Sequence, residues 1–202
     1  MHPYATNSSE RKNVVLFIAL LSVVLAWCLY RVIEWSGLRL PWWVDAPSVM
    51  GIFGALYKLF DKSLWRMVVW RKIAMVKVPD LNGRWDIEGY TSFDSNLSFK
   101  GKIIIRQTWT AISVFMETAY SRSYSLSASL LVEQPEGCTL SYEYRNEPKP
   151  NAPLTMHAHR GTCVLRMKND NLLEGEYYSG RDRQNYGSLI LRRRAGSEDD
   201  AR

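Results

Sequence analysis

Apolar residues follow two different patterns along the chain. In the first 80 residues they form long runs or recur at helical spacing, and after that they alternate with polar residues. Residues 14–30, VVLFIALLSVVLAWCLY, contain no charge and would form a helix roughly 25 Å long. With Val32 and Ile33 added, such a helix crosses a bilayer. A second apolar stretch, residues 41–60, begins with two tryptophans typical of membrane interfaces. The pattern predicts a two-helix transmembrane hairpin.

A cleaved signal peptide is the alternative for the first stretch. The run is long for the apolar part of a signal peptide, and no small-residue cleavage site separates it from the second stretch. Basic residues indicate the orientation of the hairpin, because they are rare in the short connection and frequent before the first span and after the second. We expect a two-pass membrane protein, with the N-terminus and the C-terminal domain in the cytoplasm.

Residues 61–80 form a basic linker in which apolar residues recur at helical spacing and which Pro79 ends. This stripe fits an amphipathic helix lying at the lipid headgroups, and it fits equally a helix packed on the C-terminal domain. The stripe consists of Leu64, Trp65, Val68, Val69, Lys72, Ile73 and Val76.

From residue 81 onward, a period of two predicts short strands separated by turn residues, with no helical segment between them. The expected fold class is an all-β domain, a minimal lipocalin-like, antiparallel up-and-down barrel of about eight strands; an open sandwich is the alternative. Gly83-Arg84-Trp85 and Arg192-Arg193-Arg194 resemble the closed end of lipocalin-type barrels, in which an early tryptophan packs under a late arginine. The predicted strands cover residues 83–91, 98–108, 110–119, 122–133, 137–147, 157–168, 171–179 and 186–193. The domains are thus 1–60, an N-terminal tail and two membrane helices; 61–80, the linker; 81–194, the barrel; and 195–202, a disordered tail.

The stretch CTLSYEYRNEP, residues 138–148, indicates what the barrel contains. Leu140, Tyr142, Tyr144 and Asn146 share the face that we expect to be buried, and this face becomes more polar toward one end. In an up-and-down barrel, that end lies at the rim opposite the first strand's start. We therefore expect an apolar floor below a polar mouth.

The charge of the chain narrows the class of ligand. Its formal net charge is +6, but residues 1–80 hold ten Lys or Arg against five Asp or Glu, while residues 81–202 hold sixteen against fifteen. The excess belongs to the membrane anchor, where it suits anionic lipid. The barrel lacks the positive field that polymeric nucleic acid requires, so we expect no binding of DNA or RNA. Cys28, Cys138 and Cys163 are expected to be free thiols.

Residues at the polar mouth are candidates for binding a small, flat, anionic ligand, because tyrosine rings stack on bases and arginine pairs with phosphates. For the tyrosines the alternative is a core role, for Asn146 a turn, and for the arginine a solvated loop. His157 and His159 fix no third metal ligand, so we expect no metal and no cofactor. No catalytic motif is present, and we do not expect an enzyme. The candidate ligand-binding residues are Tyr144, Asn146, Arg181, Tyr142, Tyr177, His159 and Thr91.

This architecture resembles the SMODS-associated two-transmembrane, β-strand-rich effectors of CBASS anti-phage systems. The segments that carry the resemblance are GRWDIEGYT, IIIRQTW, YEYRNEP, HAHRGT, LEGEYYSGR and YGSLILRRR. The resemblance implies that the barrel binds a cyclic oligonucleotide, such as a cyclic dinucleotide. It also implies that binding drives self-association in the inner (cytoplasmic) membrane, followed by membrane disruption and abortive infection. The alternative is a membrane-tethered lipocalin-like carrier or chaperone of an apolar small molecule, in which the apolar floor is the binding site.

Overall fold

The computed structural model describes residues 1–37, 42–92, 98–180 and 185–194. The chain forms two compact units. One consists of Ser8–Lys77, and the other combines Met1–Asn7 with Val78–Arg202. The short N-terminal segment thus belongs to the same unit as the C-terminal domain, although a helical unit separates the two in sequence.

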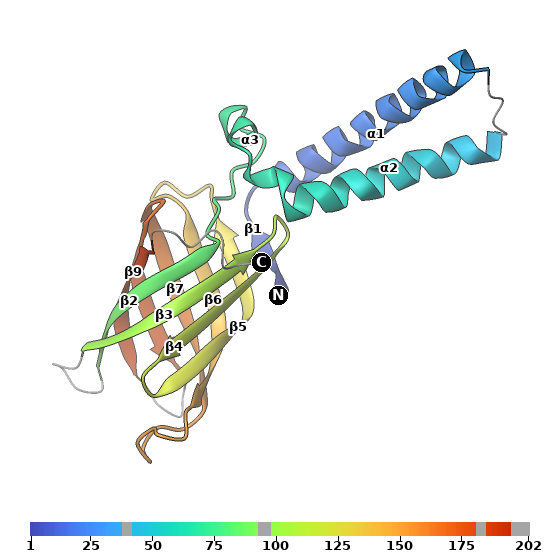
Figure 1. The fold of residues 1–202 in the computed structure, drawn as a ribbon. Helices are drawn as coiled ribbons and strands as arrows, with labels where there is room; N and C mark the ends of the chain where they lie inside the picture. The colour runs from blue at the N-terminus through green and yellow to red at the C-terminus, as the bar shows by residue number, and fades with distance from the viewer. Residues whose placement is uncertain (38–41, 93–97, 181–184, 195–202) are drawn as a thin grey trace. The chain divides into compact units, whose positions relative to one another are not determined.

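The Ser8–Lys77 unit contains helices α1 (Glu10–Trp35) and α2 (Trp42–Lys62), which run antiparallel (Figure 1). The buried residues of α1 recur every four positions at Glu10, Val14, Ile18 and Ser22, while most of its other apolar side chains are exposed. Among the described residues, α1 alone is long and apolar enough to cross a membrane. The second predicted span is a helix, α2, but Asp45, Lys58, Asp61 and Lys62 lower its apolar character.

The linker pattern is interrupted after α2. It forms a 3-10 helix, η1 (Leu64–Arg66), and a five-residue helix, α3 (Val68–Lys72). Trp65 is fully buried, and the Trp70 ring packs edge-on against Phe60, with 5.6 Å between the ring centroids. In contrast, Val68 and Ile73 are exposed. The residues of the sequence stripe therefore do not share one face.

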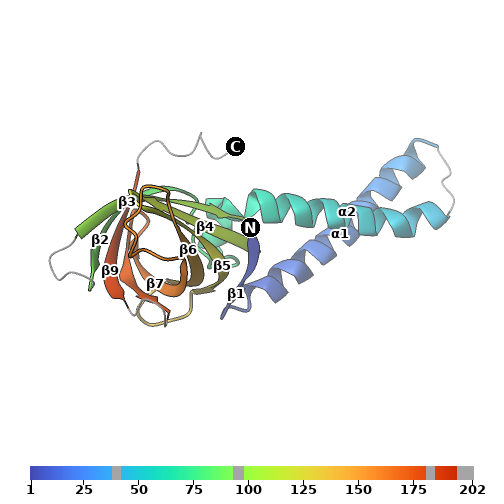
Figure 2. The ribbon, with the colours of Figure 1, turned by 90° about the horizontal axis from the view of Figure 1, so that it is seen from below.

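The second unit is a closed barrel with nine strands among the described residues. Seen along its axis, the strands form a ring (Figure 2). The eight predicted strands are all present, with small shifts at their ends. The nine strands are β1 (His2–Thr6), β2 (Gly83–Thr91), β3 (Ser98–Gln107), β4 (Ala111–Thr118), β5 (Ser121–Leu131), β6 (Thr139–Pro148), β7 (His159–Asn169), β8 (Leu172–Ser179) and β9 (Tyr186–Arg193).

The prediction of eight strands was wrong because it missed β1. This strand lies between β4 and β5, pairing antiparallel with β4 and parallel with β5. β4 and β5 pair directly only where they form a hairpin, from Phe115↔Tyr124 to Glu117↔Arg122, and a bulge in β5 at Ser125/Ser127 follows. A five-residue strand that contains proline carries almost no local signal, so its position depends on this gap between distant segments.

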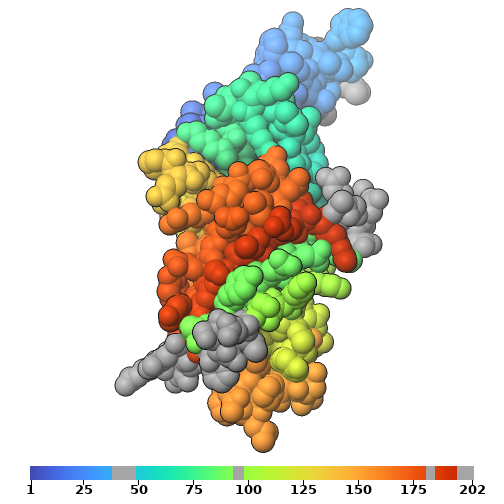
Figure 3. Space-filling model, turned by 90° about the vertical axis from the view of Figure 1, so that its left-hand side faces the viewer, coloured from blue at the N-terminus to red at the C-terminus, as the bar shows by residue number. Residues whose placement is uncertain are grey.

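The barrel closes where β2 meets β9, along the register from Trp85↔Arg193 to Thr91↔Gly187. Figure 3 shows β2 in green and β9 in red side by side on the surface. The Arg193 guanidinium lies 4.6 Å from the centre of the Trp85 ring, and its Nη2 donates a hydrogen bond to the Asp80 carbonyl at 2.6 Å. The predicted packing of an early tryptophan against a late arginine is confirmed.

The apolar core fills the barrel at the end where β2 begins. Its side chains come from nearly every strand and point inward at alternate positions, as the sequence alternation predicts. The fully buried members include Ile87, Ile103, Ile105, Leu140, Leu165, Leu173 and Leu191. This packed floor leaves the other end of the lumen for a cavity.

Candidate ligand-binding site

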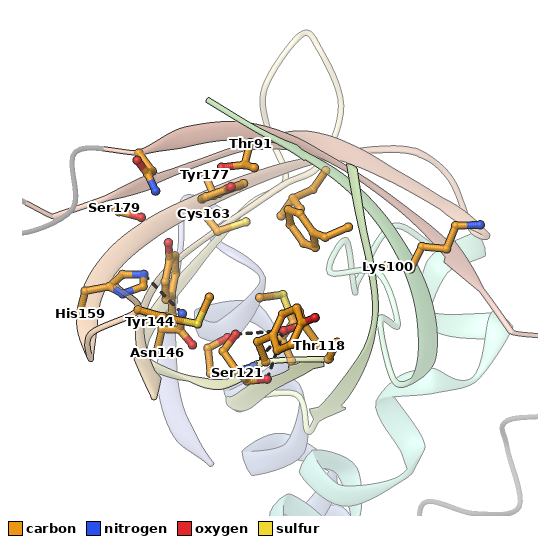
Figure 4. A pocket seen from close by; sticks show the side chains of 18 of the residues that line it. Thr91, Lys100, Thr118, Ser121, Tyr144, Asn146, His159, Cys163, Tyr177 and Ser179 are labelled. Atoms are coloured by element: carbon orange, nitrogen blue, oxygen red, sulfur yellow. Dashed lines mark hydrogen bonds between the residues drawn. The ribbon is translucent and has the colours of Figure 1, made fainter. Parts of the chain in front are cut away.

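The barrel is hollow at the end where β5 begins and β6 ends. A cavity of about 530 Å³ opens there, lined by side chains from most of the strands (Figure 4). This volume lies in the range usual for small-molecule sites. The cavity thus provides the accessible hollow that the polarity gradient of residues 138–148 predicts.

The inward face of β6 leads from the core into this cavity. Leu140 is 1% exposed, and Tyr142, Tyr144 and Asn146 are 5%, 7% and 8% exposed. Leu140 belongs to the packed floor, whereas the other three line the cavity. The prediction that these residues share a buried face with a polar end is confirmed.

Three aromatic residues of the cavity have a glycine directly opposite on the neighbouring strand. Phe99 pairs with Gly89, Tyr144 with Gly161 and Tyr177 with Gly187. A Cβ at these glycines would lie 2.7 Å from Cε1 of Phe99, 2.5 Å from Cζ of Tyr144 and 2.6 Å from Cε1 of Tyr177. Real Cβ atoms almost never approach other atoms so closely. The glycines therefore let the rings lie against the barrel wall, and the lumen beside them stays open.

Asn146 presents an acceptor to the cavity. Its Nδ2 lies 3.4 Å from Nε2 of His159, whose Nδ1 lies 2.9 Å from the His157 carbonyl oxygen. A carbonyl only accepts, so Nδ1 carries a proton and, in a neutral ring, Nε2 accepts from Asn146. The Oδ1 of Asn146 takes no part in this interaction; it is buried and has no hydrogen-bond partner among the described residues. Such an atom is costly to bury unless a bound molecule or water donates to it.

Hydroxyl groups from the β4–β5 hairpin line the adjoining wall, where Ser123 is the register partner of Asn146. Ser121, Ser123 and Thr118 all border the cavity, and the Oγ atoms of Thr118 and Ser121 are 3.0 Å apart. The charged residue in the described lining is Lys100, but its side chain is 82% exposed, points away from the interior, and lies 3.5 Å from a Glu88 oxygen. The described interior is therefore polar through hydroxyls and amides, with its charges at the edge.

Burial changes the acidity of two groups on the cavity floor. Tyr142 and Cys163 face each other across the β6–β7 register. Desolvation raises the pKa of the Cys163 thiol to about 12 and the pKa of the Tyr142 hydroxyl well above its ordinary value. Both groups are thus neutral at physiological pH, and the floor offers no anion that would repel a ligand.

Six of the seven predicted site residues line the cavity together: Thr91, Tyr142, Tyr144, Asn146, His159 and Tyr177. Arg181 lies outside the described residues. The prediction missed the serine series of β5 and several apolar residues, among them Phe99, Met116 and Leu189. The alternation of Ser121, Ser123 and Ser125 carried a signal, because serines repeating on an inward face indicate a polar wall.

A metal site was a further candidate at His157 and His159. In the part of the chain that the structure describes, there is no group of three or more His, Cys, Asp or Glu side chains that could hold a metal ion. Instead, His159 is engaged with Asn146 and with the His157 carbonyl. In this arrangement the ring positions an amide at the cavity.

Fold and site together define a class of protein, a small closed β-barrel with a ligand-sized cavity, joined to a helix long enough to cross a membrane. Comparison with known families narrows this class. The family model described as Cap15, cyclic dinucleotide receptor domain, matches residues 76–193, and the one described as Cap15, TM helices, matches residues 12–66. The chain belongs to the Cap15 family of CBASS effectors, which confirms the resemblance found in the sequence.

One curated relative is CD-NTase-associated protein 15 of Yersinia aleksiciae. It is 34% identical over 147 residues, which cover 72% of this chain and 69% of the relative. Among solved structures, a de novo designed fluorescence-activating β-barrel matches with a TM-score of 0.35 and 16% identity, covering 56% of this chain and 94% of the designed one.

Proposed function

We propose that the barrel binds a cyclic dinucleotide, or a related cyclic oligonucleotide, in the cavity at the hollow end of its lumen. Binding then drives self-association of the membrane-anchored chain and disruption of the inner membrane in anti-phage defence. The observation that carries this proposal is the buried Oδ1 of Asn146, which has no hydrogen-bond partner among the described residues and lies in a cavity that the rings of Tyr144 and Tyr177 also line. A nucleobase supplies both a flat face for the rings and an N–H donor for the amide oxygen.

Phosphate binding requires groups at the mouth of the cavity. The hydroxyls of Thr118 and Ser121 can donate to phosphate oxygens. Arg181 follows Gly180 just after the lining residue Ser179, and we propose that it pairs with a phosphate. This arrangement places the bases in the neutral interior and the charges of the ligand near solvent, where desolvation costs less.

A fatty acid or another apolar ligand is the competing hypothesis, and Phe99, Met116 and Leu189 give it some support. Such a ligand has no N–H for Asn146, so the amide oxygen would stay unsatisfied at a cost of about 1–3 kcal/mol. The amide thus favours a nucleotide over a hydrocarbon chain.

The two-unit organisation supports a proposal for the topology of the anchor. Residues 1–7 and Val78–Arg202 belong to one compact unit. We therefore propose that both ends of the helical unit lie on the same side of the membrane. If α1 crosses the bilayer, the chain must cross it again to return. The 21 residues of α2 reach about 31 Å, enough for that second crossing. We therefore propose a two-pass protein, with the barrel in the cytoplasm because basic residues flank both spans on that side.

Binding to the full-length protein in detergent tests the site. Titrations with cyclic di-GMP, cyclic di-AMP, cyclic UMP–AMP and palmitate should show that a cyclic dinucleotide binds and palmitate does not. Asn146→Ala should weaken binding by about 5–30-fold, equivalent to about 1–2 kcal/mol for a lost hydrogen bond in a buried site. Arg145→Ala is the matched control, because this neighbouring residue on β6 faces solvent.

Two outcomes contradict the proposal. Tight binding of palmitate without any dinucleotide response would favour the carrier. Dinucleotide binding that is unchanged in Asn146→Ala would place the ligand elsewhere. Dye release from phospholipid vesicles containing the full-length protein, upon addition of the binding dinucleotide, tests membrane disruption separately.

A further inference from the structure

Strand β1 is the part of the barrel that the family description leaves out. The two family models begin at residues 12 and 76, so residues 1–11 lie outside both. Nevertheless, β1 is hydrogen-bonded to two strands of the barrel and leads to α1 through only three residues, 7–9. It therefore joins the ligand-binding unit directly to the first membrane helix.

The position that β1 occupies, which we term the β1 seat, is the gap where β4 and β5 diverge. On one side His2 and Pro3 pair antiparallel with β4. On the other, residues 4–6 pair parallel with β5, from Tyr4↔Ala128 to Thr6↔Leu130. Figure 2 shows β1 alongside β5 at the edge of the ring. The seat thus exposes two strand edges whenever β1 is absent.

Side chains anchor β1 at both ends and in the middle. Tyr4 is 2% exposed, and its hydroxyl donates to the Trp109 carbonyl at 2.5 Å. Asn7 Oδ1 accepts from the Val132 amide at 2.8 Å, and His2 Nε2 lies 2.7 Å from Ser125 Oγ. All of these partners belong to the β4–β5 region of the barrel. The β1 strand of any other copy, having the same sequence, would make the same contacts.

The barrel does not depend on β1 for its closure. β4 and β5 pair directly at their hairpin end, so β2 to β9 form a closed ring there without β1. Departure of β1 would therefore leave the cavity end intact. It would also leave the N–H and C=O groups of two strand edges unpaired, and such edges readily accept another strand.

The seat is linked to the cavity through two strands. Met116 and Ser123 both line the cavity and face each other in one of the three direct β4–β5 pairs. The next inward residue on β5, Ser125, accepts a hydrogen bond from the Val114 amide at 2.9 Å and lies beside His2. A ligand seated against Ser123 therefore acts on the strand pair whose separation forms the seat.

We propose that the β1 seat is a strand-exchange site for a second copy of this chain, so that in the assembled state β1 of one copy fills the seat of the next. This inference rests on the self-association proposed above. Because the same contacts form within one copy and between copies, the two states differ little in free energy, and a ligand with modest preference for one of them shifts the balance. Exchange from copy to copy is a head-to-tail contact, which allows chains of more than two copies.

Cysteine cross-linking tests the exchange. Ala5 and Ser129 are register partners whose side chains lie on the outer face, and Cys28→Ser removes an exposed thiol. One tagged copy carries Ala5→Cys and a differently tagged copy carries Ser129→Cys, so that a disulfide between them forms only if β1 is exchanged. Both are placed in phospholipid vesicles and oxidised with copper phenanthroline. A chain that carries both substitutions forms an intrachain disulfide when its own β1 occupies the β1 seat.

We expect mixed disulfide dimers to increase several-fold with the density of protein in the vesicles and again with the cyclic dinucleotide that binds. Ser188→Cys, on the exposed face of β9, is the matched partner that should give none with Ala5→Cys. Dimers with Ser188→Cys at the same yield would show random collision and overturn the inference. Absence of the intrachain disulfide in the double variant would overturn the seat itself.

The inference and the proposed function fail separately. If a dinucleotide binds and the protein self-associates, but no mixed Ala5→Cys and Ser129→Cys dimers form, strand exchange is wrong and the proposed function stands. If no dinucleotide binds, the proposed function is wrong. In that case, cross-linking without ligand at increasing protein density still tests strand exchange. The exchange would be excluded if no mixed dimers formed at any density.

Discussion

Replacing Gly161 by alanine tests why the barrel is hollow. A Cβ at this position would lie 2.5 Å from Cζ of Tyr144, and the carbonyl oxygen of Tyr178 blocks it from behind. An ordinary contact begins at 3.4 Å, so the Tyr144 ring must move by about 0.9 Å, the difference between these distances. Since backbone lies on the other side, the ring moves toward the lumen. We expect the substitution to narrow the cavity where a base would stack.

The expected loss of affinity follows from the contact that is removed. Stacking of one base on an aromatic ring contributes about 1–3 kcal/mol, which corresponds to about 5–150-fold in the dissociation constant. Overpacking also lowers the free energy of unfolding of the barrel by about 1–3 kcal/mol. Calorimetric titration of the full-length protein with the binding cyclic dinucleotide measures the first effect, and thermal unfolding followed by tryptophan fluorescence measures the second.

Gly175→Ala is the matched control. Its Cβ would lie 2.8 Å from the Val164 carbonyl carbon and 2.9 Å from Cα of Leu165, so it strains the backbone without displacing a cavity side chain. We expect lower stability and unchanged affinity. A folded Gly161→Ala protein that binds as tightly as wild type would refute the role of glycine in keeping the lumen open. Equal loss of affinity in both variants would show that general destabilisation is responsible.

Two further predictions concern the closed end and the floor of the barrel. Arg193→Ala should lower the free energy of unfolding by about 2 kcal/mol, because the contact with the Trp85 ring is lost. Arg194→Ala removes only an exposed ion pair and should lower it by less than about 1 kcal/mol. Thermal unfolding measures both changes. Because burial raises the pKa of Cys163 to about 12, its thiol should resist iodoacetamide at pH 8 in the folded protein and react after unfolding. Above about pH 9 the thiol ionises in the unfolded state but stays neutral in the folded state, so the free energy of unfolding falls as the pH rises. In Cys163→Ala this contribution is missing, and the free energy of unfolding should fall less steeply with pH than in the wild type.

The cavity and the β1 seat share the β4–β5 pair, which gives this region two roles. At the hairpin end the pair supplies the hydroxyl wall of the cavity, and beyond the bulge at Ser125/Ser127 it separates to hold β1. A bulge bends its strand and increases the local twist, and this bulge in the β5–β6 ladder lies where β5 passes from pairing with β4 to pairing with β1. Cavity-lining residues and the pairing partners of β1 therefore lie on the same two strands.

Local pattern was sufficient for much of this protein. The apolar run of α1, the eight strands β2 to β9 and the inward face of Leu140, Tyr142, Tyr144 and Asn146 follow from periodicity, because burial on one face of a helix or strand leaves its period in the sequence. The packing of Arg193 on Trp85 was also predicted, from the resemblance of the two short segments that carry these residues to the closed end of lipocalin-type barrels.

Contacts between distant segments decided the rest. β1 has no periodic signal, and only the gap between β4 and β5 makes residues 2–6 a strand. The hollow lumen depends on which residue stands opposite each aromatic ring, and the register that pairs Tyr144 with Gly161 or Tyr177 with Gly187 is a property of the assembled sheet. The free acceptor of Asn146 likewise exists only because His159, on the next strand, takes its amide N–H. Periodicity reports which face of a strand is buried, whereas the space inside a barrel is set by neighbours that the fold alone brings together.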